Sequence, residues 1–148
     1  MASLTPQKQA YRVPFVERTQ MQYLAKERGY AKLLMPLGPN ANHVDVMYMG
    51  AFTVLAEATA ANPGISFLDT EKHFPIVKDI AVDFHRMAAS DVTAEYRLSE
   101  EDIAALEADL ARKGSATYVA EVPMLNADGA LVATGKVTIK LLSHQWSG

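Results

Sequence analysis

The stretch between residues 47 and 61 constrains this chain most strongly, because it predicts a helix with almost no polar side. At 1.5 Å per residue it makes about four turns. The apolar residues that surround its axis are Met47, Tyr48, Met49, Ala51, Phe52, Val54, Leu55, Ala58, Ala60 and Ala61. A helix that is apolar on every side is normally buried on every side. We therefore expect a curved sheet to enclose it, and its one ionisable side chain is Glu57.

The composition limits the classes of protein to which such a helix can belong. The chain has 148 residues, of which 49% are hydrophobic and 21% charged, as in one soluble globular domain. A net charge of −3 argues against a nucleic-acid partner. The absence of cysteine excludes disulfides, thiol nucleophiles and thiolate metal sites, and the four histidines lack metal-ligand spacing. The N-terminus lacks an apolar signal core and the apolar stretch has polar flanks, so we expect a cytoplasmic protein without a membrane span.

Local patterns predict the elements that precede and follow the central helix. An outer helix is expected at 14–28, with Gly29 just after its end, and a strand at 30–37. Asn62-Pro63-Gly64 should end the central helix, and a short extended piece is expected at 65–68. Residues 1–13 are expected to be loosely held, and Trp146 in the tail either packs at a subunit contact or is free.

The second half of the chain alternates between apolar and polar residues. This alternation predicts strands at 76–86, 92–98, 116–125 and 130–142, and it places Ile76 on the same face as Ile80 and Val82. Ser99 is expected to cap a helix at 100–112, whose apolar stripe is Ile103, Leu106 and Leu110. The order predicts an α+β domain of mostly antiparallel strands, whose uncovered sheet edges require a partner chain.

Three residues around the start of the central helix are spaced as in a known family. The family's pattern is an Asn, then His-Gly-Gly six residues later, then a helix with an Asp or Glu nine residues after the His. Asn42 matches the Asn, Gly50 the second Gly, and Glu57 the helical acid, within the segment GAFTVLAEATA. The chain therefore resembles the hot-dog fold, and specifically its small acyl-CoA thioesterases.

The resemblance implies an α+β hot-dog fold, in which a curved antiparallel sheet wraps around a central helix. It implies a single domain over residues 1–148, with an N-terminal arm or helix at 1–29 and the hot-dog core at 30–142. It also implies a homodimer, or a dimer of dimers (a homotetramer), with the site at the dimer interface. The small-molecule partner would be an acyl thioester, with no cofactor other than CoA as part of the substrate.

Two positions depart from the family pattern. Tyr48 stands where the His usually stands, and Met49 replaces the first Gly, while His43 beside Asn42 is a candidate to compensate. These departures leave two further hypotheses open on the same fold. One is a non-catalytic protein that binds an acyl group or a lipid, and the other is a structural dimerisation domain with no cavity beside Glu57.

Glu57 is the residue most suited to chemistry. Gly50, Thr53 and Glu57 share one narrow side of the predicted helix. A carboxylate in apolar surroundings has a raised pKa, which suits a general base. The alternative is that Glu57 points into solvent or pairs with an Arg.

The resemblance implies that Glu57 activates water against the thioester carbonyl while facing Asn42 of the partner subunit. The backbone N–H groups of Met49 and Gly50, at the positive end of the helix dipole, would stabilise the oxyanion. Tyr48 could donate to the same oxygen, or it could be a core residue. Asn42 could orient water or substrate, or it could form the loop. The alternative for the helix start is ordinary capping by Asp45. Candidates for substrate binding are His43, Thr53 and Arg86.

Overall fold

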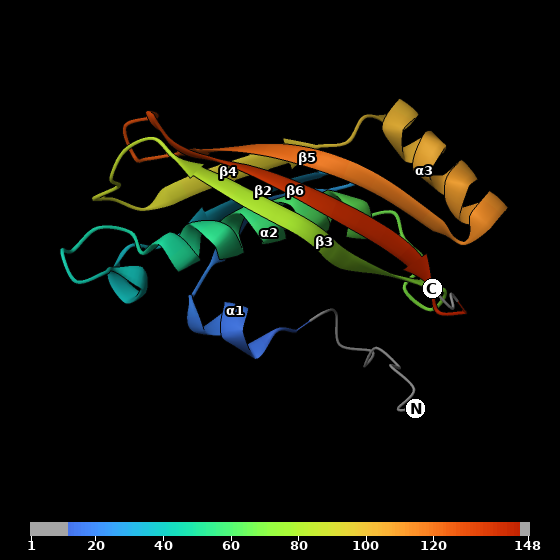
Figure 1. Cartoon of the computed structure of the whole chain (residues 1–148), viewed down its shortest axis with the longest axis horizontal. Helices are drawn as coiled ribbons and strands as arrows, with labels where there is room; N and C mark the ends of the chain where they lie inside the picture. Colours follow the sequence, from blue (N-terminus) through green and yellow to red (C-terminus); the bar gives the residue numbers. More distant parts are fainter. Residues whose placement is uncertain (1–11, 146–148) are drawn as a thin grey trace.

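The computed structural model describes residues 12–145 (Figure 1). Residues 1–11 of the predicted N-terminal arm and Trp146 lie outside the described residues. The helical elements are α1 (Pro14–Arg18), a 3₁₀ turn η1 (Gly38–Asn40), α2 (Met49–Ile65) and α3 (Glu100–Lys113). The strands are β1 (Gln22–Glu27), β2 (Tyr30–Met35), β3 (His73–Phe84), β4 (Val92–Arg97), β5 (Ser115–Leu125) and β6 (Leu131–Ser143).

The strands form one antiparallel sheet that curves around α2 (Figure 1). Its order is β1-β2-β4-β5-β6-β3, so that β1 and β3 are the edges of the sheet. The predicted α+β class, with a curved antiparallel sheet wrapped around a central helix, is confirmed. None of the described helices is long and apolar enough to span a membrane.

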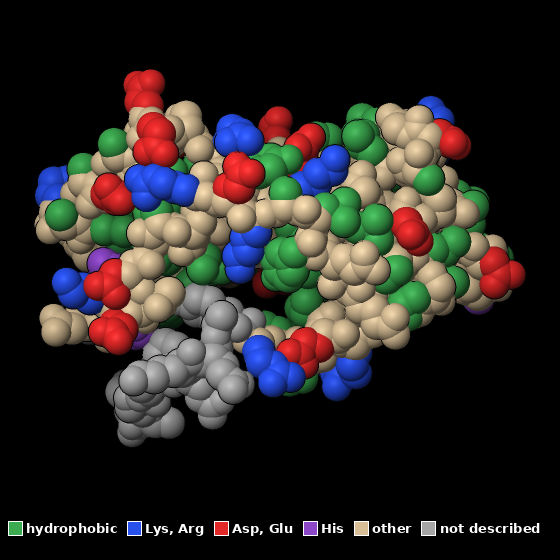
Figure 2. Space-filling view, turned by 180° about the vertical axis from the view of Figure 1, so that it is seen from behind, with side chains coloured by type: hydrophobic (Ala, Val, Ile, Leu, Met, Phe, Trp, Pro, Cys, Tyr) green, Lys and Arg blue, Asp and Glu red, His purple; other side chains and the backbone are tan. Residues whose placement is uncertain are grey.

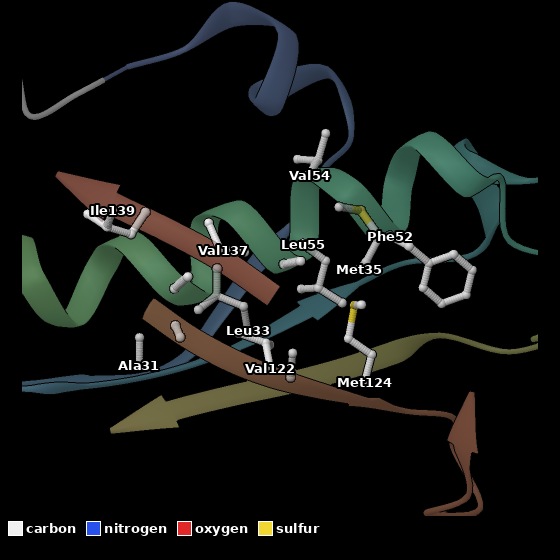
Figure 3. Close-up of a cluster of buried hydrophobic side chains, with 14 of the residues drawn as sticks. Ala31, Leu33, Met35, Phe52, Val54, Leu55, Val122, Met124, Val137 and Ile139 are labelled. Atoms are coloured by element: carbon white, nitrogen blue, oxygen red, sulfur yellow. The ribbon is translucent and has the colours of Figure 1, made fainter. Parts of the chain in front are cut away.

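The core lies between α2 and the concave face of the sheet. Phe52 and Leu55 of α2 pack against inward side chains of β2, β5 and β6, among them Leu33, Met124 and Val137 (Figure 3). Gly135 of β6 allows α2 to approach closely, since a Cβ at this position would lie 2.7 Å from the Cβ of Ala56. This packing explains why the helix needs apolar residues on nearly every side.

The predicted helix at 14–28 is wrong beyond residue 18. The chain instead returns as β1 and pairs with β2, and Gly29 is the hairpin turn residue, with a φ of +71°. Pairing with the adjacent strand β2 outweighs the helical pattern of these residues, because local propensity is only a prior that cross-strand contacts override. The sheet therefore begins at Gln22, before residue 30, where the sequence predicts the start of the core.

The predicted end of the central helix is also wrong. The helix α2 begins at Met49 and continues through Pro63 and Gly64 to Ile65, so no extended piece follows at 65–68. Both Pro63 and Gly64 are buried. The packing contacts that bury this end of the helix offset the cost of the backbone hydrogen bond that proline cannot make.

A β-bulge changes the predicted faces of β3. The register with β6 shifts between Val77 and Asp79, and an extra residue at such a point reverses the alternation of side chains. As a result Val77 packs on the core with Ile80 and Val82, while Ile76 is exposed. The expectation that Ile76 shares their face is wrong for this reason.

The helix α3 agrees with its prediction. Ser99 and Asp102 form a capping box, and Ile103, Leu106 and Leu110 are its buried residues. It packs against β5 at one end of the sheet (Figure 1). The outer side of α2, which faces away from the sheet, is therefore not covered by α3.

Candidate active site

A cleft of about 870 Å³ runs along the outer side of α2, between this helix and the N-terminal part of the chain. The helix α1 lies on the side of α2 that faces away from the sheet (Figures 1 and 3). The space-filling view shows a hollow on this face of the molecule, bordered by hydrophobic side chains (Figure 2). The lining residues include Val13, Val16, Met21, Tyr23, Lys26, Val54, Glu57, Ala58, Ala61, Ile65, Ile76 and Val77.

Glu57 reaches this cleft from the middle of α2. Its neighbours on the lining of the cleft are Val54, Ala58 and Ala61, and Val54 points toward α1 (Figure 3). The Glu57 side chain is exposed in the single chain, but desolvation by the atoms around its carboxyl raises the pKa of that carboxyl above its ordinary value. Within residues 12–145, this carboxylate forms no hydrogen bond or ion pair, so the alternative of an Arg partner is not observed.

The N-terminus of α2 has free backbone donors. Tyr48 occupies the N-cap without a side-chain cap, and Asp45 lies in the preceding turn with a φ of +60°, so the alternative of capping by Asp45 is not observed. The N–H of Ala51 donates to the carbonyl of Tyr48 at 2.9 Å. The N–H groups of Met49 and Gly50 have no acceptor among the described residues.

Tyr48 is exposed in the single chain and is not a core residue. Its ring lies against the first turn of α2, where a Cβ on Gly50 would come within 2.5 Å of the tyrosine Cε1. Glycine at position 50 therefore permits this arrangement. The ring and the free N–H groups lie together at this end of the helix.

Asn42 shapes the loop before α2. Its Oδ1 accepts hydrogen bonds from the N–H of Val44 at 3.0 Å and of Val46 at 3.2 Å. Its backbone N–H donates to the carbonyl of Val46 at 2.8 Å. The loop-forming role is thus observed, and the Nδ2 group has no acceptor among residues 12–145.

The comparisons with known proteins place the chain in a family. The family described as Domain of unknown function (DUF4442) matches residues 5–141. The chain belongs to this family. A Pseudomonas aeruginosa protein of unknown function, described as a probable thioesterase, is 34% identical, with a TM-score of 0.83 and 89% of each chain covered. No curated protein matches the sequence.

Solved structures with lower identity to this DUF4442 protein share its fold. A thioesterase variant from Staphylococcus aureus is 18% identical, with a TM-score of 0.72 over 88% of this chain and 99% of the other. A thioesterase from Haemophilus influenzae is 16% identical, with a TM-score of 0.67 over 89% and 85%. The resemblance to hot-dog thioesterases is confirmed, and the fold is the hot-dog fold.

The remaining sequence candidates of the DUF4442 protein lie outside the cleft. His43 is exposed on the loop before α2, and Thr53 donates from Oγ1 to the Met49 carbonyl at 3.3 Å. Arg86 is exposed just after β3, whereas the cleft is lined by residues near the start of that strand. Of all the predicted site residues, Glu57 alone is on the lining of the cleft.

Sequence reasoning missed the outer wall of the cleft. Val13, Val16 and Met21 form part of it, and Lys26 lies there over the ring of Tyr23 at 5.1 Å. The one available signal was the uneven spacing of the apolar residues Phe15, Val16, Met21 and Leu24, and it predicted an outer helix instead. Among the described residues, no group of three or more His, Cys, Asp or Glu side chains is arranged to hold a metal ion.

Proposed function

We propose that this DUF4442 protein is a thioesterase that hydrolyses an acyl-CoA or acyl-carrier thioester at a boundary between two copies of the chain. The observation that carries the proposal is Glu57, a carboxylate without a partner among the described residues, in a cleft of ligand size. Its raised pKa suits a general base at neutral pH. The substrate would supply CoA or the carrier, and water would be the second reactant.

In the proposed reaction, Glu57 takes a proton from water while the water oxygen attacks the thioester carbonyl carbon. The N–H groups of Met49 and Gly50 stabilise the resulting oxyanion, with the dipole of α2 behind them. The carbon–sulfur bond then breaks, and the proton held by Glu57 passes to the leaving thiolate. The products are a carboxylic acid and a free thiol.

A second copy is needed to complete this site. Gly50 and Glu57 of one chain are about 10 Å apart along the helix axis, too far to act on one carbonyl group. The free N–H groups would therefore come from the partner, with Glu57 facing Asn42 of the partner subunit. Tyr48 and Met49 are more than half exposed, at 55% and 57%, and β3 is an open edge, which supports an interface there.

The relatives add support to this assignment. The Pseudomonas aeruginosa protein is described as a probable thioesterase at 34% identity. Two Staphylococcus aureus variants carry a Gln-to-Ala and a Glu-to-Ala substitution at positions 15 residues apart. Asn42 and Glu57 have the same spacing.

The proposal is tested by measuring thiol release from a panel of acyl-CoA thioesters. Glu57→Gln and Glu57→Ala should lower kcat by about 10²- to 10⁴-fold, the usual contribution of a general base. Glu101→Gln on the exposed side of α3 is the matched control and should keep the wild-type rate. Hydrolysis by both Glu57 variants at the wild-type rate would refute the proposal.

A non-catalytic acyl-binding protein is the second candidate. It is favoured by Tyr48, which replaces the family's His and whose ring lies against the helix N-terminus. This candidate expects acyl-CoA binding by calorimetry without release of CoA. The structural dimerisation domain expects no cavity beside Glu57, whereas the cleft of the single chain reaches this residue.

Both candidates share one expectation about assembly. Light scattering on the eluting protein should give the mass of a dimer or a tetramer. A clean monomer at micromolar concentration would contradict the shared site.

A further inference from the structure

The cleft continues past Glu57 along the second half of α2. From Glu57 to Ile65 the helix extends about 12 Å, and Ala58, Ala61 and Ile65 line the cleft along this length. The opposite wall comes from the N-terminal segment, and a third side comes from β3. The apolar residues on these two sides are Val13, Val16, Met21, Ile76 and Val77.

This part of α2 offers almost no hydrogen-bonding group to a ligand. Asn62 also lines the cleft, but its Nδ2 donates back to the carbonyl of Ala58 at 2.7 Å. Thr59 is fully buried on the other side of the helix. A polar acyl group placed here would lose its water without gaining partners, at a cost that an alkyl chain does not incur.

Two charged groups on the N-terminal side of the cleft neutralise each other, and the lining also holds Lys26 and Glu71. Arg12 and Glu17 form two hydrogen bonds, at 2.5 and 3.1 Å. The ammonium group of Lys26 rests over the ring of Tyr23. These contacts reduce the attraction that the wall would exert on a charged acyl group.

The size of the cleft suits a ligand. Its volume of about 870 Å³ lies within the range of about 300–1,000 Å³ that is usual for ligand pockets. Ala58 and Ala61 are the residues of α2 that leave this room, since larger side chains would fill it.

We infer that the acyl group of the substrate is an uncharged alkyl chain of medium or greater length, which lies between α2 and residues 12–21 with its carbonyl at Glu57 and its methyl end toward Ile65. The inference rests on the proposed function for the position of the carbonyl. The N-terminal segment then determines the preferred chain length, because it supplies the outer wall.

The first test is the chain-length profile with saturated acyl-CoA thioesters from acetyl to palmitoyl. The value of kcat/KM should rise about fourfold per added methylene until the cleft is filled, the factor that corresponds to about 0.8 kcal/mol per buried methylene. Succinyl-CoA, whose acyl group ends in a carboxylate, should be hydrolysed at least a hundredfold less efficiently than lauroyl-CoA. Equal or better hydrolysis of succinyl-CoA would overturn the inference.

The second test fills the cleft from either wall. Ala61→Phe on α2 and Val16→Trp on α1 should each lower the ratio of lauroyl-CoA to butyryl-CoA efficiency at least tenfold. Ala105→Phe, the same change at an exposed position of α3, should leave both the rate and the ratio unchanged. Thermal melts of each variant show whether it is folded. An unchanged profile in folded Ala61→Phe and Val16→Trp would overturn the inference. The same result is expected if a partner chain, and not the acyl chain, occupies the cleft.

Binding measurements separate this inference from the proposed function. Lauroyl-CoA is titrated by calorimetry into Glu57→Gln, with and without Ala61→Phe. Binding that Ala61→Phe weakens tenfold, together with a wild-type protein that releases no CoA from any thioester, would refute the thioesterase and keep the alkyl cleft. Hydrolysis of thioesters at rates that do not depend on acyl-chain length would support the thioesterase and refute the alkyl cleft. Absence of binding and of hydrolysis would refute both hypotheses.

Discussion

The hydroxyl group of Tyr118 on β5 donates a 2.6 Å hydrogen bond to the carbonyl oxygen of Ala60 on α2. Burial raises the pKa of Tyr118, so the hydroxyl remains a neutral donor at physiological pH. A Cβ on Gly64 would lie 2.5 Å from the same hydroxyl oxygen. The end of α2 that carries the cleft is therefore held to the sheet at one crowded point.

This crowding predicts that Gly64→Ala destabilises the protein by about 1–3 kcal/mol through overpacking. Tyr118→Phe should cost about 1 kcal/mol through the lost hydrogen bond. Because Tyr118→Phe also removes the atom with which the new methyl group collides, the double variant should lose less stability than the sum of the two. Urea denaturation measures all three, and additivity within about 0.5 kcal/mol would show that the two residues are not coupled.

The raised pKa of Glu57 predicts a pH-dependent effect on stability. A carboxyl whose pKa is higher in the folded than in the unfolded protein binds its proton more tightly when folded. Its stabilising contribution is therefore present at low pH and is lost as the pH rises through the folded pKa. Glu57→Gln removes the charge, so it should raise the Tm at pH 7 and change it less at pH 4.

Thermal melts of wild type and Glu57→Gln between pH 4 and pH 8 measure this difference. Glu101→Gln, on the exposed side of α3, should show no such trend. If Glu57→Gln changes the Tm by the same amount at every pH, the glutamate is not desolvated in the folded protein.

Substitutions can separate the role of the Asn42 Oδ1 atom from that of its Nδ2 group. Asn42→Asp keeps an oxygen for the N–H groups of Val44 and Val46, so its Tm should stay near wild type. It loses the Nδ2 donor, and we expect its rate of thioester hydrolysis to fall at least tenfold. Asn42→Ala should lose this activity and also about 1–2 kcal/mol of stability, because the loop amides lose their acceptor. Full activity in Asn42→Asp would mean that the role of Asn42 is to shape the loop and not to act in catalysis.

Removal of the capping box of α3 should lower the stability of the protein without lowering its activity. The Oγ of Ser99 accepts from the N–H of Asp102 at 3.0 Å, and the Asp102 carboxylate accepts from the N–H of Ser99 at 3.0 Å. Ser99→Ala should cost about 1 kcal/mol in urea denaturation. Ser99→Thr keeps the hydroxyl and is the matched control. Thioester hydrolysis should be unchanged in both, because α3 is not part of the cleft, and a lower kcat in Ser99→Ala would contradict this separation.

Elements with local signals were predictable from the sequence. The helix α3 carries its N-cap at Ser99, its apolar stripe and Gly114 at its end, and the structure places it at Glu100–Lys113. The long strands likewise follow from alternation, because side chains on one face of a strand share one environment. The bulge in β3 was not predictable, since a single extra residue leaves no mark in composition.

Elements that depend on pairing or packing with another segment were predicted wrongly. Residues 22–27 become a strand because β2 lies beside them, and α2 continues past Pro63 because Tyr118 and the core cover its end. The outer wall of the cleft was missed for the same reason. Val16 and Glu57 come from parts of the chain that no local pattern connects.

The sequence by itself determined that a helix apolar on all sides must be enclosed, that it carries one acid, and that Asn42, Gly50 and Glu57 have a family's spacing. These features follow from residue types and intervals along one element. Only the tertiary structure decided that Glu57 lines a cleft with apolar neighbours from other segments, that Tyr48 is exposed and that Asn42 holds a loop. Desolvation and exposure depend on every atom near a group, and those atoms are brought together by folding rather than by order in the chain.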